Sequence, residues 1–161
     1  VSLMLPAAFG HGAPAVGAEA GTGVVERGLR EAVKSGTVPS GIRISYDDLH
    51  TIYGGTLIEV RGDGSAYRID VSERGDRETT RHVEKAALLE LLKQFVAVRA
   101  WKQETPELPP IPDESRAMLW NELGGEKAGF WERYNEMEDN GRMLRIRESL
   151  DRLVPPAGDR R

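Results

Sequence analysis

Two runs of alternating apolar and polar residues lie on either side of a short glycine-rich segment in the first half of the chain. The runs are Thr56–Arg61 and Ser65–Val71, and Gly62-Asp63-Gly64 separates them. Alternation with a period of two predicts β-strands, and an Asp-Gly pair at a chain reversal supplies the positive φ that tight hairpin turns need. The pattern therefore predicts a β-hairpin.

We expect this hairpin to have one apolar face and one charged face. The apolar face is predicted to hold Ile58, Val60, Tyr67, Ile69 and Val71. The charged face is predicted to hold Glu59, Arg61, Arg68 and Asp70. An antiparallel sheet with this division of side chains is covered by other elements on one side only.

Four more stretches predict strands around this hairpin. Gly41–Tyr46 alternates apolar and polar residues, and Arg77–His82 is a polar stretch that suits the edge of a sheet. Ser115–Leu123 and Glu126–Tyr134 flank Gly124-Gly125, which is typical of a two-residue hairpin turn. We expect a second hairpin at this place.

Two segments have apolar residues at helical spacing. Val83–Arg99 is predicted to be a helix because four large apolar residues recur at intervals of three and four, namely Leu88, Leu91, Leu92 and Phe95. The final helix is marked by Met143, Ile146, Leu150 and Leu153, and it ends at Pro155-Pro156. Asp139 or Asn140 is the predicted N-cap of this last helix.

These elements indicate the α+β class. We expect a two-layer sandwich in which an antiparallel sheet of about five strands carries two helices on one face, in the order β-β-β-α-β-β-α. The 161 residues are enough for one domain with a core. Residues 1–20 are interpreted as a signal-like or disordered leader, 21–40 as a linker with a short helical turn weakened by Gly28, 41–154 as the domain and 155–161 as a tail.

The first 20 residues contain no Lys or Arg and a single acid, Glu19. Val1–Phe9 resembles the apolar core of a secretory signal, although the basic start of such signals is absent. Ala13-Pro14-Ala15 and Ala18-Glu19-Ala20 both match the small-x-small cleavage pattern. We expect a periplasmic or extracellular protein without a transmembrane segment in its mature domain, or a cytoplasmic one if this leader is not a signal.

Charge and cysteine content exclude several functions. The formal net charge is −4, which argues against a broad nucleic-acid surface because phosphate binding needs clustered Lys and Arg. The chain has no cysteine, so disulfides, thiolate catalysis and cysteine-ligated zinc are excluded.

Three aromatic residues of the second hairpin are the preferred binding candidates. A two-residue turn places Trp120 and Trp131 on one face as diagonal neighbours. If that face lies under the helices, the two rings belong to the core. If it lies on the open side, they form with Tyr134 an aromatic platform for a sugar, a peptide or a partner protein.

Asp47, Asp48 and His50 form the alternative polar site. A carboxylate beside an imidazole can orient it for acid–base catalysis or share a metal ion with it. The chain has no recognised metal-ligand spacing, so neither a metal nor another cofactor is predicted. Glu136–Glu148 fails as a calcium loop because Arg147 stands where a bidentate acid is required.

Three local features resemble a group of uncharacterised bacterial exported α+β domains. They are Gly54-Gly55 before a strand that ends in Gly62-Asp63-Gly64, the Leu-rich helix that leads to an aromatic residue in Leu88–Trp101, and Pro112-Asp113-Glu114 before a later strand. The resemblance covers residues 41–154. It implies an exported α+β domain and carries no catalytic residues.

The sequence favours a non-enzymatic exported domain that binds a protein or an envelope component through the open face of its sheet. One alternative is a small hydrolase or metal-dependent enzyme that uses His50 with Asp47 or Asp48. Another is a small inhibitor or immunity protein that presents a charged sheet to a basic target.

Overall fold

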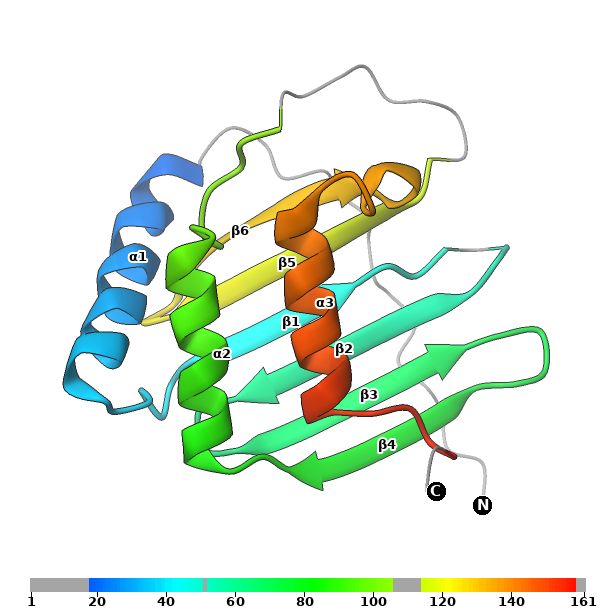
Figure 1. The fold of residues 1–161 in the computed structure, drawn as a ribbon, viewed down its shortest axis with the longest axis horizontal. Coiled ribbons are helices and arrows are strands. Elements are labelled where there is room, and N and C mark those ends of the chain that lie inside the picture. Colours follow the sequence, from blue (N-terminus) through cyan, green and yellow to red (C-terminus); the bar gives the residue numbers. More distant parts are fainter. Residues whose placement is uncertain (1–17, 51, 106–113, 159–161) are drawn as a thin grey trace.

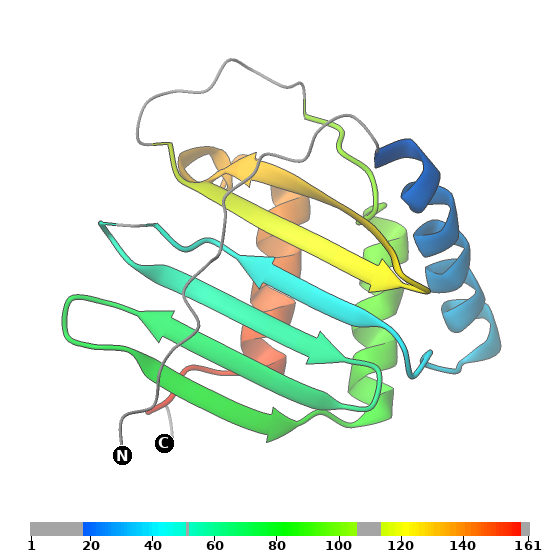
Figure 2. The same ribbon diagram turned by 180° about the vertical axis from the view of Figure 1, so that it is seen from behind.

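The computed structural model describes residues 18–50, 52–105 and 114–158. These residues form one six-stranded antiparallel sheet whose spatial order is β4-β3-β2-β1-β5-β6. Two helices, α2 and α3, lie on one side of this sheet, and α1 flanks its β5–β6 end (Figure 1). Figure 2 shows the other side of the sheet, and none of the described helices crosses it. We call these two sides the covered face and the uncovered face.

The strands are β1 (Arg43–Asp47), β2 (Gly55–Arg61), β3 (Ser65–Val71), β4 (Arg77–His82), β5 (Arg116–Leu123) and β6 (Glu126–Arg133). The helices are α1 (Ala18–Ser35), α2 (Lys85–Ala97) and α3 (Gly141–Leu153), with a short 3-10 helix, η1 (Tyr134–Glu136), after β6. The α+β class and the antiparallel sheet are as predicted. The prediction of about five strands and two helices in the order β-β-β-α-β-β-α was wrong in detail, because four strands precede α2 and one more helix precedes β1.

The additional helix is α1, in the segment that the sequence analysis interpreted as leader and linker. Its residues Val25 and Leu29 are completely buried in the same hydrophobic cluster as the rest of the fold. A Cβ atom at Gly28 would lie 2.0 Å from Cδ2 of Leu123, so this glycine lets α1 approach the end of β5. The burial of this face outweighs the intrinsic cost of about 1 kcal/mol for a glycine inside a helix.

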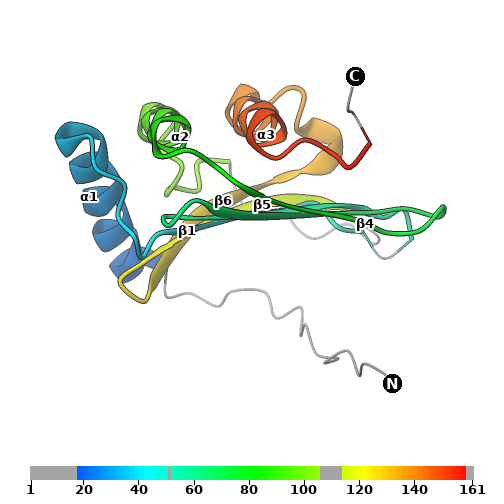
Figure 3. The same cartoon turned by 90° about the horizontal axis from the view of Figure 1, so that it is seen from below.

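The helices differ in how they meet the sheet. Figure 3 shows α2 and α3 above the strands, whereas α1 runs down past the end of the β5–β6 hairpin. α1 contacts β6, β5 and α2, and α2 also contacts α3. The side chains that fill the space between α2, α3 and the sheet include Leu88, Leu92, Phe95, Met143, Ile146, Leu150, Ile44, Tyr46, Ile58 and Phe130.

The first hairpin forms where the sequence predicts it, but the side chains of β3 face the other way. The pairs are Val60 with Ala66, Glu59 with Tyr67 and Ile58 with Arg68. A three-residue connection puts residues of equal parity opposite each other, and a shift of one residue turns every side chain to the other face. The buried Arg68 therefore shares the covered face with Ile58, and Tyr67 lies on the uncovered face.

Three further local predictions are confirmed, namely a hairpin turn, a helix cap and an edge strand. Gly124 and Gly125 have φ values of 61° and 80°, as a tight two-residue hairpin turn requires. The side chain of Asn140 caps α3, because its Oδ1 accepts hydrogen bonds from the backbone N–H groups of Arg142 (3.0 Å) and Met143 (3.3 Å). β4 lies at the edge of the sheet, as its polar sequence predicts.

Candidate functional site on the uncovered sheet face

Trp120 of β5 and Trp131 of β6 both project from the uncovered face. Trp120 lies opposite Gly129, and Trp131 lies opposite Met118, so the two indole rings are diagonal neighbours. Both tryptophans are half-buried. Phe130, which precedes Trp131 in β6 and points to the covered face, is 1% exposed. Because Gly129 has no side chain, β6 places nothing directly opposite Trp120.

A cation lies over each of the two indole rings. The guanidinium carbon of Arg116 is 4.0 Å from the centroid of Trp131, and Nζ of Lys127 is 4.7 Å from the centroid of Trp120. A cation over an indole is attracted by the negative face of the ring, with a gain of about 0.5–1 kcal/mol where water has access. Each of the two indole rings therefore has a cation of its own.

The strand register extends this aromatic pair into two rows of side chains. The first row crosses five strands and consists of Ile69, Leu57, Asp47, Met118 and Trp131. The second row is more polar and consists of Thr80, Tyr67, Glu59, Ser45 and Trp120. The first row is apolar except for Asp47, so the uncovered face has an apolar strip that leads from β3 to the tryptophans.

Glu59, a member of the second row, forms ion pairs with two arginines of the uncovered face. The carboxylate of Glu59 accepts hydrogen bonds from Arg43 (2.6 Å) and Arg61 (2.7 Å). Burial acts to raise the pKa of Glu59, but the hydrogen bonds from Arg43 and Arg61 outweigh it and hold the pKa below its usual value. Glu59 is therefore ionised at neutral pH, and its charge is already compensated.

A second carboxylate is held in the same way beside Trp131. Arg116 donates to Glu114 at 3.0 Å, and Arg133 donates to the other oxygen of the same carboxylate. Burial acts to raise the pKa of Glu114, but these two arginines lower it below its usual value. Arg116 thus bridges a carboxylate and an indole ring, which fixes the position of both.

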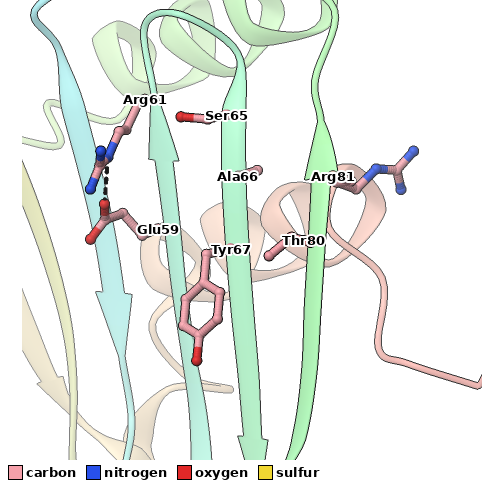
Figure 4. Close-up of a pocket in the computed structure, with 7 residues that line it drawn as sticks. All are labelled: Glu59, Arg61, Ser65, Ala66, Tyr67, Thr80 and Arg81. Carbon is pink, nitrogen blue, oxygen red and sulfur yellow. Dashed lines mark hydrogen bonds and ion pairs between the residues drawn. The ribbon is translucent and has the colours of Figure 1, made fainter.

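A shallow hollow of about 270 Å³ lies between β2, β3 and β4 on this face. Figure 4 shows its lining, which consists of Glu59, Arg61, Ser65, Ala66, Tyr67, Thr80 and Arg81. The ring of Tyr67 lies along the strands at one end of the hollow. Burial and the neighbouring carboxylate of Glu78 raise the pKa of the Tyr67 hydroxyl, so this group is a neutral hydrogen-bond donor.

The backbone at Trp131 is fixed by a side chain from outside the sheet. The N–H of Trp131 donates to Oε1 of Gln103 (2.8 Å), and Nε2 of Gln103 donates to the carbonyl of Trp131 (3.1 Å). One side-chain amide therefore pairs with the outer edge of β6 as a neighbouring strand would. Tyr134, the third aromatic candidate, lies in η1 beyond the end of β6, and its side chain is 45% exposed.

The structure separates the two carboxylates of the predicted polar site, Asp47 and Asp48. Asp47 and Asp48 are consecutive in the chain and point to opposite faces of the sheet, where Asp47 Oδ1 accepts from the N–H of Leu49 (2.8 Å). Nδ1 of His50 accepts from the N–H of Ile52 (3.1 Å) within the β1–β2 turn. Within the part of the chain that the structure describes, no cluster of three or more potential metal-ligating side chains is found.

Asp48 belongs instead to a buried network that the sequence analysis missed. It is 4% exposed, and its oxygens accept hydrogen bonds from the Tyr46 hydroxyl (2.8 Å), the Thr56 N–H (2.5 Å) and Arg147 (2.5 Å). Burial and the charge of Asp48 raise the pKa of Tyr46, which stays protonated and donates to this carboxylate.

Arg68 forms the other half of this network. Its side chain is 3% exposed and donates to Asp70 (2.7 Å), Asp151 (2.5 Å) and the carbonyl of Val154 (3.0 Å). Asp151 also binds Arg147 at 2.9 Å, which joins the two halves. The donors and acceptors satisfy one another, so the network fastens α3 to the sheet and leaves no polar group directed at a ligand. The sequence signal for the position of Arg68 was the length of the three-residue turn, which decides which side chains of β3 face the helices.

The chain matches no protein-family model, and no curated protein is found to be similar to it. The site is therefore interpreted from its own geometry. Among the described residues, no helix is both long and apolar enough to cross a lipid bilayer.

Proposed function

We propose that this protein is a non-enzymatic exported module that binds a protein or an envelope component through the uncovered face of its sheet. The observation that carries the proposal is the pair Trp120 and Trp131, half-buried on a face without helices and continued across the strands by a strip that is apolar except for Asp47. Tryptophan and arginine are the residues that most often dominate the affinity of protein interfaces.

The arrangement of charge supports a protein partner. The strip is apolar except for Asp47, which lies between Leu57 and Met118, and Glu59 and Glu114 are paired with arginines beside it. Protein interfaces have this composition, with an apolar and aromatic centre and a polar rim that keeps contact with water. Five strands at about 4.8 Å spacing give the strip a length of about 19 Å, enough for an extended peptide or one turn-rich loop.

Export is supported by the position of the core relative to the leader. Both small-x-small motifs of the sequence precede Val25, the first side chain that the structure describes as buried. Cleavage after Ala15 or Ala20 would therefore keep every residue that the structure describes as buried. The mass of the protein purified from its native host tests this part, since a processed chain lacks the leader and an unprocessed one contradicts export.

The binding proposal is tested by capture from the native host with three matched baits. These are the wild-type domain, Trp131→Ala, and Tyr53→Ala as the control. Tyr53 is 78% exposed in the β1–β2 turn, so its variant removes an aromatic ring of similar size outside the proposed surface. We expect a stoichiometric partner with wild type and Tyr53→Ala, and at least tenfold less of it with Trp131→Ala.

The stability of each bait is measured in parallel by urea unfolding. A half-buried ring on the uncovered face loses less contact than a ring in the core, so Trp131→Ala should lower the free energy of unfolding by less than the roughly 3–5 kcal/mol of a buried aromatic residue. Retention of the same partner by Trp131→Ala would contradict the proposal. Loss of binding together with a large loss of stability would assign Trp131 to the core instead.

A further inference from the structure

β4 ends the sheet with an open edge. It pairs with β3 on one side, and among the described residues no element pairs with its other side (Figure 1). Every side chain of β4 is exposed except Thr79, which is half-buried. An open edge presents unpaired backbone N–H and C=O groups, which makes it a place where another strand can add.

The hydrogen bonds to β3 determine which backbone groups point outward. The N–H of Val83 donates to the carbonyl of Gly64 at 2.8 Å, which makes this opposed pair a hydrogen-bonded one. Hydrogen-bonded and non-bonded pairs alternate along an antiparallel ladder. The N–H and C=O groups of Glu78, Thr80 and His82 are therefore directed away from β3.

We propose that β4 pairs with β4 of a second copy of this chain. The strands run antiparallel around a two-fold axis that passes beside Thr80, perpendicular to the sheet. Thr80 then lies opposite Thr80 of the second copy, and Glu78 lies opposite His82 of the second copy at both ends of the contact. The proposal does not rest on the binding function proposed above.

The sequence of β4 selects this register among the alternatives. An axis at Thr79 would also pair outward-facing groups, Glu78 with Thr80 of the second copy, but it places Arg77 opposite Arg81 of the second copy, and like charges that face each other are destabilising. An axis at Glu78 places two carboxylates opposite each other, and an axis at His82 leaves most of the strand unpaired. The axis at Thr80 uses all three outward-facing residues and opposes an acid to an imidazole twice.

The contact is self-complementary and small. Three hydrogen-bonded pairs supply about six backbone hydrogen bonds, two from each pair. A contact between two edge strands buries less than the roughly 1,200–2,000 Å² of a standard stable interface, so the dimer is expected to form only at micromolar concentrations or above. The axis is perpendicular to the sheet, so the two uncovered faces would continue into each other.

A single engineered thiol tests the pairing, because the chain has no cysteine of its own. In a hydrogen-bonded antiparallel pair the Cα atoms are about 5.5 Å apart, within the range of about 4.4–6.8 Å that a disulfide spans. Thr80→Cys should therefore form a covalent dimer under mild oxidation. Non-reducing electrophoresis during the oxidation measures the rate.

Glu78→Cys is the matched control, on the same strand and the same face. The two copies of residue 78 lie four residues apart along the paired strands, about 14 Å, which no disulfide spans. We expect Thr80→Cys to cross-link at least tenfold faster than Glu78→Cys. A mixture of Glu78→Cys and His82→Cys should yield the mixed dimer, because those two positions face each other.

Equal cross-linking rates for Thr80→Cys and Glu78→Cys would overturn the proposal, since chance collisions treat both thiols alike. Sedimentation velocity of the wild type gives a second, independent result. A dimer fraction that rises with concentration and falls in Thr80→Pro supports the pairing, because proline removes an outward N–H and leaves the ladder to β3 in place. A wild type that stays monomeric up to millimolar concentrations would also overturn the proposal, and the charges of β4 would then be what keeps the edge free.

Discussion

The cations on the covered face of this sheet differ from those on the uncovered face in their burial and in the groups that they contact. On the covered face, Arg68 of β3 is buried and Arg147 of α3 is half-buried, and both direct their donors at carboxylates of the sheet and of α3. On the uncovered face, Arg116 and Lys127 lie over indole rings and keep contact with water. The covered cations hold the layers together, whereas the uncovered ones shape a surface.

This difference leads to a ranking of substitutions by face. Removing one partner of a buried ion pair leaves the other charge without compensation in a medium that cannot solvate it. The same change at an exposed pair lets water replace the missing partner. If the two faces have the roles assigned above, stability should depend strongly on the first and weakly on the second.

The largest effect is expected for Arg68→Ala. Its side chain is 3% exposed, and its loss removes the main partner of Asp70 and one of the two arginines that bind Asp151. Breaking a buried pair in this way costs about 3–5 kcal/mol, which urea unfolding measures directly. Arg43→Ala is the control on the uncovered face, where the side chain is 51% exposed and the expected loss is at most about 1 kcal/mol. Equal losses for both variants would remove the distinction between the faces.

Two consecutive residues of β6 test the same distinction with apolar side chains. Phe130 points into the core and is 1% exposed, so Phe130→Ala should destabilise the fold by about 3–5 kcal/mol. Trp131→Ala removes a larger ring from the uncovered face, but that ring is only half-buried, so the loss should be smaller than for Phe130→Ala. A reversed order in urea unfolding would place the core on the side of the tryptophans.

Periodicity along the chain was sufficient to predict most elements of this fold. The Leu-rich pattern gave α2, the alternation around Gly62-Asp63-Gly64 gave β2 and β3, and the polar stretch Arg77–His82 gave an edge strand. Each of these signals is local, because the residues that carry it are neighbours in the sequence. The same holds for Asn140, whose capping bonds go to the next turn of its own helix.

The predictions failed where the outcome depends on contacts between distant residues or on the length of a turn, because neither is visible in the periodicity of a single element. α1 was underestimated because Gly28 looks like a helix breaker until Leu123, the side chain that packs on it, is known. The face of Arg68 was wrong because it depends on the length of the turn rather than on the alternation. For Trp120 and Trp131, the two-residue turn predicted a shared face, but the choice between core and surface depends on which side the helices cover.

Two glutamates should respond to pH with opposite signs. Glu132 on the covered face is 2% exposed, and burial raises its pKa above the ordinary value of 4.5, although Thr105 donates to it at 2.6 Å. The folded state then binds its proton more tightly than the unfolded state, so stability falls as pH rises from about 4.5 through the folded pKa. Glu132→Gln removes this loss and should be more stable than wild type at pH 7 but not at pH 4.

Glu114 provides the contrast, because Arg116 and Arg133 hold its pKa below 4.5. Its carboxylate contributes stability above pH 4.5 that disappears as pH falls through the folded pKa. Glu114→Gln should therefore be less stable than wild type at pH 7, and the difference should shrink in acid. Urea midpoints of both variants and the wild type at pH 4 and pH 7 check the signs. The same sign for both glutamates would mean that burial does not dominate at Glu132.

The smallest effect is expected for Lys127→Ala, which removes the cation 4.7 Å from the centroid of Trp120. An exposed cation–π contact is worth about 0.5–1 kcal/mol, so the urea midpoint should barely move. The indole N–H resonance of Trp120 should shift, while that of Trp131 keeps its position because Arg116 remains over its ring. Glu126→Ala, at an exposed position next to Lys127 in β6, should move neither resonance. A shift at Trp131 alone would mean that the two rings do not have separate cations, and the description of the uncovered face would have to change.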